Sequence, residues 1–226
     1  MTITDKLKNN IIVSVQAMPD EPLYQEVCMK AMMQSVINGG ATTLRVAGSR
    51  DVKIAKDLGV TVIGLTKPNK LPTNWQEVVY ITPGINEVKE LINADADVIA
   101  FDGTMRPRPD GSSLNDIIDL IHSNNKLAMA DIATFEEGLN ADKLNTDIIS
   151  TTLSGYTLES ISEKETPDFE LLEKLVKATN KPIVLEGRIW STEEVRKAFE
   201  LGAHSVVIGS AITRPQLITK RFIEGI

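Results

Sequence analysis

The sequence predicts an α/β fold, a (β/α)8 barrel of the TIM type, with parallel strands in a single domain that spans residues 1–226. Short, nearly all-apolar runs alternate with longer amphipathic stretches, and such continuous apolar runs are typical of parallel strands covered on both faces. The length of 226 residues lies near the lower limit for eight βα units. No change in composition and no Pro/Gly-rich linker indicates a second domain.

Nine apolar runs compete for the eight strand positions of such a barrel. Val78–Ile81 is the weakest, because the stretch before it contains Pro68 and Pro72 and is short for a parallel crossover, which needs about a dozen residues. We therefore expect residues 67–83 to form a long loop with a short extra strand at Val78–Ile81. The other runs are the expected barrel strands: Ile11–Val15, Thr42–Val46, Val60–Leu65, Val98–Phe101, Leu127–Ala130, Ile148–Thr151, Ile183–Leu185 and Val206–Ile208.

Helical patterns fill the stretches between the strands. The first is predicted over residues 23–37, with its methionines in the helix core and with one face formed by Leu23, Val27, Ala31 and Ser35. A later helix is predicted over Thr192–Leu201, where Ser191 or Thr192 is the expected cap, Glu194 lies in the first turn and Gly202 ends the helix. Two further stretches with a helical pattern are Leu114–Ile121 and Phe169–Val176.

Polar residues follow almost every predicted strand. In this fold the chemistry occurs at the C-terminal ends of the strands. Bringing an amine, a guanidinium and several carboxylates together there costs solvation energy that a purely structural barrel could avoid. For single residues such as Asp102 and Asp131, helix capping or loop hydrogen bonding is the alternative interpretation. The strand-end residues are Gln16, Arg45, Lys67, Asp102, Asp131, Thr151 with Thr152, Glu186, and Gly209 with Ser210.

The last two strands each run into a glycine. Phosphate sites in such barrels are typically built from the loops after the seventh and eighth strands, and Gly187 and Gly209 would let backbone amides approach the phosphate oxygens closely. Ser210 adds a hydroxyl, and Arg188 or Arg214 adds positive charge. The alternative is that both glycines only make turns, but their paired placement favours a phosphate site.

Lys67 follows a predicted strand directly and precedes Pro68, which fixes it at the rim of the barrel. Burial near Arg45 would lower the pKa of its amine toward neutrality and make it a usable base. The same features would suit a nucleophile that forms a Schiff base. Its sequence position does not separate these two chemistries.

Composition excludes several other classes of protein. A net charge of −7 and a pI of about 5.0 disfavour a nucleic-acid partner. No apolar run is long enough for a membrane span, Cys28 is the only cysteine, and residues 1–6 lack the apolar region of a secretory signal, so a cytoplasmic location is expected. Two histidines, His122 and His204, and one cysteine are too few for a His/Cys transition-metal site, and we expect none.

Two long motifs are specific enough to suggest a family. They are Thr-Thr-Leu-Ser-Gly-Tyr-Thr at residues 151–157 and Gly-Ser-Ala-Ile-Thr-Arg-Pro at residues 209–215. With them, along nearly its whole length, the chain resembles the N-acetylmannosamine-6-phosphate 2-epimerases. It departs from the family pattern at Pro68, where many members have arginine, and at Gly103, where they have alanine. Shorter matching segments are Ser14–Gln16, Gly39–Arg45, Ile63–Lys67, Tyr80–Pro83, Ala100–Asp102, Met129–Ile132 and Glu186–Arg188.

The resemblance implies a function and a set of roles. It implies reversible inversion at C2 of N-acetylmannosamine 6-phosphate, which gives N-acetylglucosamine 6-phosphate, in the breakdown of sialic acid and amino sugars. It implies no redox cofactor and no essential metal, and it is compatible with a homodimer. Lys67 and Glu186 map to the positions expected to transfer protons. The residues that map to substrate contacts are Gln16, Arg45, Asp131 and Arg214.

Three rival functions use the same barrel. One is another phosphosugar epimerase or isomerase, for example a pentulose-phosphate 3-epimerase, which would need a histidine-rich metal site that His122 and His204 do not supply. The second is an aldolase with a lysine Schiff base, and the third is a non-catalytic sugar-phosphate sensor. A sensor is expected to have lost the strand-end lysine or glutamate, and both are present here. Which residue acts on which face of C2, and whether ring opening is assisted, stay open.

Overall fold

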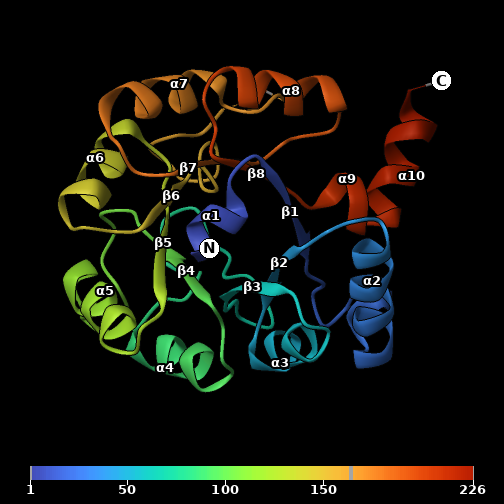
Figure 1. Ribbon diagram of the computed structural model, residues 1–226, viewed down its shortest axis with the longest axis horizontal. Helices are drawn as coiled ribbons and strands as arrows, with labels where there is room; N and C mark the ends of the chain where they lie inside the picture. The colour runs from blue at the N-terminus through green and yellow to red at the C-terminus, as the bar shows by residue number, and fades with distance from the viewer. Residues whose placement is uncertain (1, 163–164, 226) are drawn as a thin grey trace.

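The protein, described here by a computed structural model of residues 2–162 and 165–225, is a closed barrel of eight parallel strands within those residues. Each strand pairs with the next along the chain, and β8 pairs with β1 (Figure 1). The predicted (β/α)8 fold is therefore confirmed. The strands are β1 (Asn10–Val15), β2 (Thr43–Ala47), β3 (Thr61–Leu65), β4 (Val98–Asp102), β5 (Leu127–Asp131), β6 (Ile148–Ser150), β7 (Ile183–Glu186) and β8 (Ser205–Ile208).

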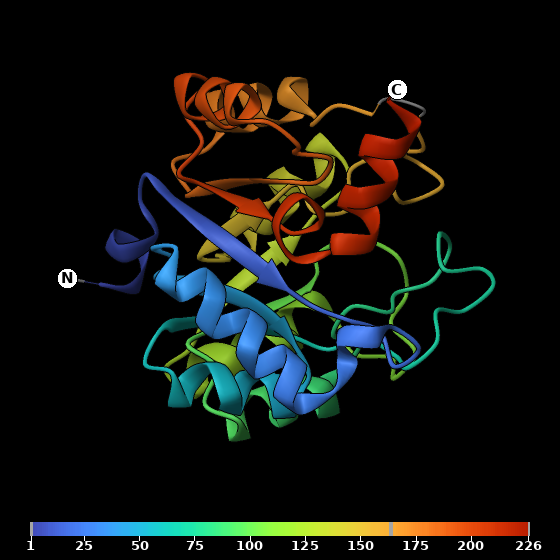
Figure 2. The same ribbon diagram turned by 90° about the vertical axis from the view of Figure 1, so that its right-hand side faces the viewer.

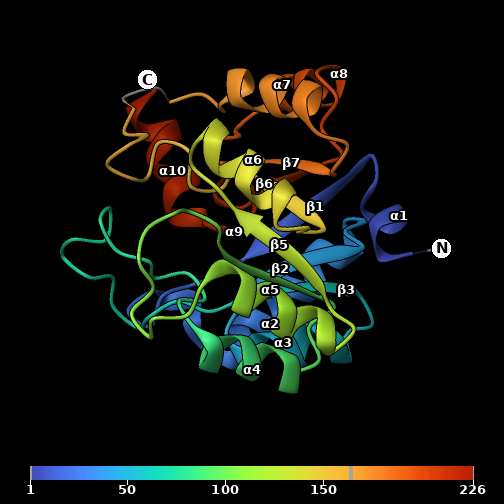
Figure 3. The ribbon, with the colours of Figure 1, turned by 90° about the vertical axis from the view of Figure 1, so that its left-hand side faces the viewer.

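The helices form a ring around the strands, and the two ends of the barrel differ. Figures 2 and 3 show the short helix α1 at one end, beside the N-terminus, and the long loop after β3 projecting from the opposite end. None of the helices in residues 2–162 and 165–225 has the length and apolar character that crossing a bilayer requires. The helices are α1 (Ile3–Leu7), 3-10 helix η1 (Pro22–Tyr24), α2 (Glu26–Asn38), α3 (Ser49–Asp57), α4 (Ile85–Asn93), α5 (Leu114–Ser123), α6 (Phe135–Lys143), α7 (Phe169–Ala178), α8 (Thr192–Glu200), α9 (Ser210–Thr213) and α10 (Pro215–Glu224).

Alternation along the strands decides which side chains point into the barrel. Successive side chains of a strand point to opposite faces. Ile63 and Leu65 of β3 and Val98 and Ala100 of β4 belong to the core inside the barrel, whereas their neighbours pack against the helices. Extending this alternation by two residues carries Lys67 after β3, and Asp102 at the end of β4, onto the interior side. The same rule applies to Arg45, Asp131, Thr152 and Glu186.

The predicted extra strand at Val78–Ile81 is wrong: the segment is part of an irregular loop. It lies against β3 and β4, because the amide of Thr82 donates to the carbonyl of Thr66 at 3.0 Å and the amide of Asp102 donates to the carbonyl of Ile81 at 3.1 Å. The carbonyl of Val78, however, accepts from the guanidinium of Arg106 at 3.0 Å instead of from a neighbouring strand. The backbone bonds therefore do not continue into a ladder.

The predicted apolar face of the first helix is also wrong. Helix α2 begins at Glu26, after the 3-10 turn, and Val27 is 74% exposed while Met29 and Met33 are buried. The methionines carry more apolar area than the Leu/Val/Ala/Ser row, so the helix turns them toward the barrel. The prediction that the methionines form the helix core is confirmed for Met29 and Met33, and Met32 is half-buried against the same core. For α8, the expected cap is present, because Ser191 and Glu194 form a capping box.

Candidate active site

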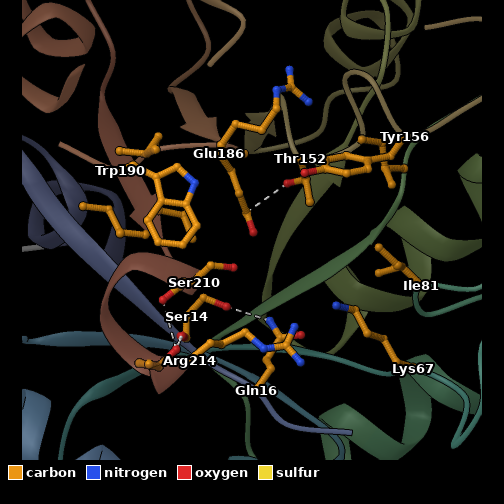
Figure 4. Close-up of a pocket in the computed structure, with 18 of the residues that line it drawn as sticks. Ser14, Gln16, Lys67, Ile81, Thr152, Tyr156, Glu186, Trp190, Ser210 and Arg214 are labelled. Atoms are coloured by element: carbon orange, nitrogen blue, oxygen red, sulfur yellow. Dashed lines mark hydrogen bonds between the residues drawn. The ribbon is translucent and has the colours of Figure 1, made fainter. Parts of the chain in front are cut away.

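A pocket of about 420 Å³ opens at the C-terminal ends of the strands. In Figure 4 the amine of Lys67 and the carboxyl group of Glu186 point into this one cavity from different sides. All but two of the predicted site residues line it. Those that line it are Gln16, Lys67, Glu186, Gly187, Arg188, Gly209, Ser210 and Arg214.

The other two predicted site residues, Arg45 and Asp131, lie beneath the pocket. Both side chains are essentially inaccessible, at 1% and 0% exposure, and Arg45 Nη2 donates to Asp131 Oδ2 at 2.5 Å. Arg45 Nε lies 3.3 Å from Glu186 Oε2, so the guanidinium also faces the carboxylate at the pocket wall. Arg45 and Asp131 therefore form a charged floor beneath the pocket, and Arg45 faces Glu186 in the pocket wall.

Thr152 connects this floor to the pocket. Its hydroxyl lies 2.8 Å from Asp131 Oδ1, 3.0 Å from Glu186 Oε2 and 2.8 Å from the hydroxyl of Ser150. Thr152 and Glu186 both line the pocket, whereas Asp131 and Ser150 are fully buried. One hydroxyl group thus contacts both carboxyl groups of the site (Figure 4 shows its bond to Glu186).

The position of Lys67 lowers the pKa of its amine, first because the surrounding barrel rim removes water and second because of the positive charge of Arg45; Glu186 and Asp131 oppose this. The side chain is accessible through the pocket mouth, so its desolvation is completed only when a ligand fills the cavity. The chain around Lys67 is fixed, because the Thr66 amide donates to the hydroxyl of Thr82 at 3.0 Å.

The pKa of the Glu186 carboxyl group is shifted upward, opposite to the shift of the Lys67 amine. Burial raises the pKa of its carboxyl group, and the charge of Asp131 adds to this, while Arg45 and the hydrogen bond from Thr152 oppose it. The pocket therefore brings together an amine that loses its proton readily and an acid that keeps its proton longer than usual. A pair of groups displaced in this way is suited to accept and donate protons near neutral pH.

Gly187 and Gly209, the two glycines of the predicted phosphate cradle, lie at positions where a side chain would be strained or crowded. Gly187 adopts a φ of 108°, a conformation that favours glycine. A side chain at Gly209 would put its Cβ atom 3.3 Å from the Cβ atom of Ser14, which is tighter than most such contacts. The amide of Ile212 donates to the carbonyl of Gly209 in the turn after β8. The amides of Ser210 and Ala211 come before it, in the first turn of a helix, where amides have no partner within the helix.

The two arginines of the predicted cradle differ in their contacts. Arg188 donates to the backbone carbonyls of Ser154 and Thr166 at 2.7 and 2.9 Å, and its guanidinium lies 5.5 Å from the ring centre of Tyr156. Its charge is thus committed to the loop after β6. Arg214 pairs with Glu21 at the pocket edge, and its buried Nε makes no hydrogen bond within the part of the chain described by the structure. Arg214 is the better placed of the two to hold a ligand.

Comparison with known proteins identifies the family. The model of the N-acetylmannosamine-6-phosphate epimerase family matches residues 29–226. Two relatives named for this epimerase are similar: one from Clostridium perfringens is 47% identical, over 97% of this chain and 98% of its own, and one from Caldanaerobacter subterraneus is 46% identical, over 100% and 94%. The solved structure of the C. perfringens N-acetylmannosamine-6-phosphate 2-epimerase has a TM-score of 0.94 and 45% identity, and the match covers 100% of this chain and 97% of that one. The chain belongs to this family.

Several pocket residues of this epimerase-family chain were not singled out from its sequence. Tyr80, Tyr156 and Trp190 line the cavity, and burial, followed by the charge of Asp102, raises the pKa of Tyr80 to about 12. Tyr80 and Tyr156 lie within motifs that the family resemblance marks, but no spacing rule distinguishes them from structural residues. Only the motif itself could have found them.

Asp102, one of the strand-end acids, does not line the pocket of this epimerase-family chain. It is fully buried, bonds Thr104, and pairs with Arg106 at 2.7 Å, while Arg106 also holds the carbonyls of Gln76 and Val78. The alternative interpretation, loop hydrogen bonding, is therefore correct for Asp102. The pair fastens the loop that carries Tyr80 to the end of β4.

The histidines of this epimerase-family chain lie outside the pocket. His122 contacts the carboxylate of Asp147 at 2.8 Å, and His204 contacts the carbonyl of Thr4 at 2.9 Å. Over residues 2–162 and 165–225, no three side chains of His, Cys, Asp or Glu gather in a way that could hold a metal ion. That the reaction needs no metal stays a prediction.

Proposed function

We propose that this chain interconverts N-acetylmannosamine 6-phosphate and N-acetylglucosamine 6-phosphate by removing and returning the proton on C2, in the breakdown of sialic acid and amino sugars. Family membership supports this reaction. The observation that carries the proposal is that the Lys67 amine and the Glu186 carboxyl group, with pKa values shifted toward neutrality, face one pocket beside the Gly187/Gly209 backbone.

The phosphate holds the far end of the sugar. We assign it to the amides around Gly187 and Gly209, the hydroxyl of Ser210 and the charge of Arg214, with Arg188 supporting the loop behind them. In an eight-stranded barrel the loops after β7 and β8 face those after β3 and β4 across the mouth. A phosphosugar anchored at the former extends its C1–C2 end toward Lys67, and this binding energy orients C2 for reaction.

Proton removal begins once the sugar ring has opened and the C1 carbonyl acidifies the C2–H bond. The neutral Lys67 amine takes the C2 proton, the electrons of the C–H bond form the C1–C2 double bond, and negative charge develops on the C1 oxygen. Gln16, whose side-chain amide lines the pocket, is placed to donate a hydrogen bond to that oxygen. Arg45 and Asp131 act from beneath by holding Glu186.

Return of the proton to the opposite face of C2 completes the inversion. Glu186 faces Lys67 across the cavity and is the group that supplies this proton, or Lys67 returns it after the enolate has turned. When Lys67 returns the proton itself, the enzyme ends in its starting protonation state. When Glu186 supplies the proton, Lys67 is left protonated and Glu186 ionised, and a proton must pass from Lys67 to Glu186, directly or through solvent, before the next turnover in the same direction. The two routes share the step in which C2 loses its hydrogen.

The proposed reaction is tested by incubating the chain with N-acetylmannosamine 6-phosphate and following the anomeric proton signals of both sugars. We expect N-acetylglucosamine 6-phosphate to accumulate to a constant ratio from either direction. Trapping with borohydride in the presence of substrate separates the aldolase alternative, because only a Schiff base would become a stable adduct on Lys67. A chain that leaves both sugars unchanged would contradict the proposal and favour a sensor.

Arg214→Ala is expected to raise KM for the phosphosugar by about 10- to 100-fold, which corresponds to the loss of one hydrogen bond to a charged group, with a smaller change in kcat. The measurement is initial-rate kinetics over a range of substrate concentrations. Arg196→Ala is the matched control, because Arg196 forms an exposed pair with Glu193 on α8. Equal KM values for Arg214→Ala and the wild type would show that Arg214 does not contact the ligand.

The proposed function also carries expectations for the location and the partners of the chain. We expect the chain to work in the cytoplasm and to bind no nucleic acid, given its net charge of −7. We expect no cofactor. A homodimer is compatible with the family, and light scattering of the purified chain tests it.

A further inference from the structure

The hydroxyl of Thr152 lies within hydrogen-bond distance of more acceptors than its single hydrogen can bond at once. A threonine hydroxyl has one hydrogen to donate and two lone pairs that accept. Asp131 Oδ1 and Glu186 Oε2 lie 2.8 and 3.0 Å from it on one side, and the hydroxyl of Ser150 lies 2.8 Å away. If both carboxyl groups were ionised, only one of them could receive the hydrogen of Thr152, and the other would face an oxygen lone pair.

Counting hydrogens shows what each protonation state of Glu186 requires. The buried guanidinium of Arg45 pairs with Asp131 Oδ2 in both states. When Glu186 is protonated, its O–H donates to Thr152 and Thr152 donates to Asp131, so each contact has one donor. When Glu186 is ionised, Thr152 donates to Glu186 instead, and Asp131 Oδ1 faces a lone pair of Thr152 while Asp131 Oδ2 keeps its bond from Arg45. The hydroxyl of Ser150 donates to a remaining lone pair of Thr152 in either case.

We infer that Thr152 is a positioning residue whose hydroxyl turns from Asp131 to Glu186 when Glu186 loses its proton, so that the newly ionised carboxylate has a hydrogen-bond donor. The inference rests on the proposed function for its effect on turnover. Between the two arrangements only the Glu186 O–H bond breaks or forms, and that proton passes to or from the sugar. The hydrogen of Thr152 stays on Thr152.

The surroundings of Glu186 show why this hydroxyl matters. The charged groups that face Glu186 are Arg45 from β2, Lys67 after β3 and Asp131 from β5. The attraction of Arg45 and the repulsion of Asp131 act from the floor in both states. Thr152 is the neutral donor that adapts to the state of Glu186, and its hydrogen bond lowers the pKa of that carboxyl group. Removing the hydroxyl therefore raises this pKa further, because a hydrogen bond to the charged form is stronger than one to the neutral form.

Thr152→Val tests the inference, because valine keeps the shape of threonine and removes the hydroxyl. We expect kcat/KM at pH 7 to fall by about 10- to 100-fold, the equivalent of one hydrogen bond to a charged group, and the limb of the pH–rate profile that belongs to Glu186 to move to higher pH. Thr152→Ser should restore the wild-type limb. Thr152→Ala provides a second variant without the hydroxyl, should valine not be accommodated.

Thr151→Val is the matched control. Thr151 is the neighbouring threonine and also bonds Glu186, but its hydroxyl contacts the backbone carbonyl and amide of Glu186 at 3.0 and 3.1 Å and not the carboxyl group. We expect this variant to lower the melting temperature and to leave the Glu186 limb at the wild-type pH. A shift of equal size in both threonine variants would overturn the inference in favour of a general loosening of β6 against β7.

A titration without substrate separates this inference from the proposed reaction. The side-chain carboxyl carbon of Glu186, observed by NMR in protein labelled with [13C]glutamate and assigned through Glu186→Gln, should titrate at higher pH in Thr152→Val than in the wild type and in Thr152→Ser. Coincident titration curves for the wild type and both hydroxyl-free variants would overturn the role of Thr152. An inactive wild-type chain whose Glu186 still shows this dependence would contradict the proposed function alone.

Discussion

Lys67→Ala is expected to lower kcat by about 10²- to 10⁴-fold, the usual contribution of a positioned general base, while substrate binding remains measurable. Alanine removes the amine that accepts the C2 proton but leaves the phosphate cradle and the charged floor intact. Initial rates and isothermal titration calorimetry with N-acetylmannosamine 6-phosphate measure the two effects separately. Lys70→Ala, three residues further along the same loop and exposed, is the control and should behave as the wild type.

The roles of Lys67 and Glu186 also predict how kcat/KM depends on pH. Because the pKa of Lys67 is lowered, the amine is neutral over a wider range than usual, and activity falls on the acid side as Lys67 becomes protonated. Because the pKa of Glu186 is raised, activity falls on the alkaline side as Glu186 loses its proton, if Glu186 is the acid. Retention of the acid limb, with substantial turnover, in Lys67→Ala would show that another residue is the base.

The second large effect concerns stability. Arg45→Met should lower the free energy of unfolding by about 3–5 kcal/mol, the usual cost of removing one partner of a buried ion pair. Asp131 and Glu186 would then face each other without the guanidinium that lies 2.5 Å from one and 3.3 Å from the other. Urea denaturation measures the change in the free energy of unfolding. In a thermal scan, the same substitution should lower the melting temperature by about 10 °C for a chain of this size.

Arg196→Met is the control for this stability measurement. Arg196 and Glu193 are 67% and 71% exposed, so their ion pair is expected to contribute less than about 1 kcal/mol. An Arg45→Met protein as stable as the control would show that the floor beneath the pocket is not a tightly packed ion pair. In that case Asp131 and Glu186 would have to be separated by water or by a shared proton.

The fold and the residues of the pocket were predictable because both follow from local patterns. The apolar runs located the strands to within a residue or two, and the rule that chemistry follows the strand ends selected Lys67 and Glu186, which line the pocket. The failure at Val78–Ile81 has a cause distant in the sequence. The segment has the composition of a strand, but the guanidinium of Arg106, 28 residues further along the chain than Val78, takes the carbonyl that a ladder would use.

The depth of each site residue could not be predicted from the sequence, because it depends on the register between strands. Arg45 is paired with Ile63, and Lys67 lies four residues beyond Ile63 in the chain, which places Arg45 well below the amine along the barrel axis. A rule that inspects strand ends treats both as rim residues. The three contacts of the Thr152 hydroxyl likewise join β5, β6 and β7, and no single segment of the sequence indicates them.

The central claim is that the reaction passes through removal of the hydrogen on C2, and exchange with solvent tests it most directly. The chain is incubated with N-acetylmannosamine 6-phosphate in D₂O, and the C2 position of the N-acetylglucosamine 6-phosphate formed is examined by proton NMR and mass spectrometry. The account predicts deuterium at C2 of the product formed by the wild type. It also predicts that the Lys67→Ala protein forms little of this deuterated product. Product formed at the wild-type rate with its original hydrogen on C2 would contradict it.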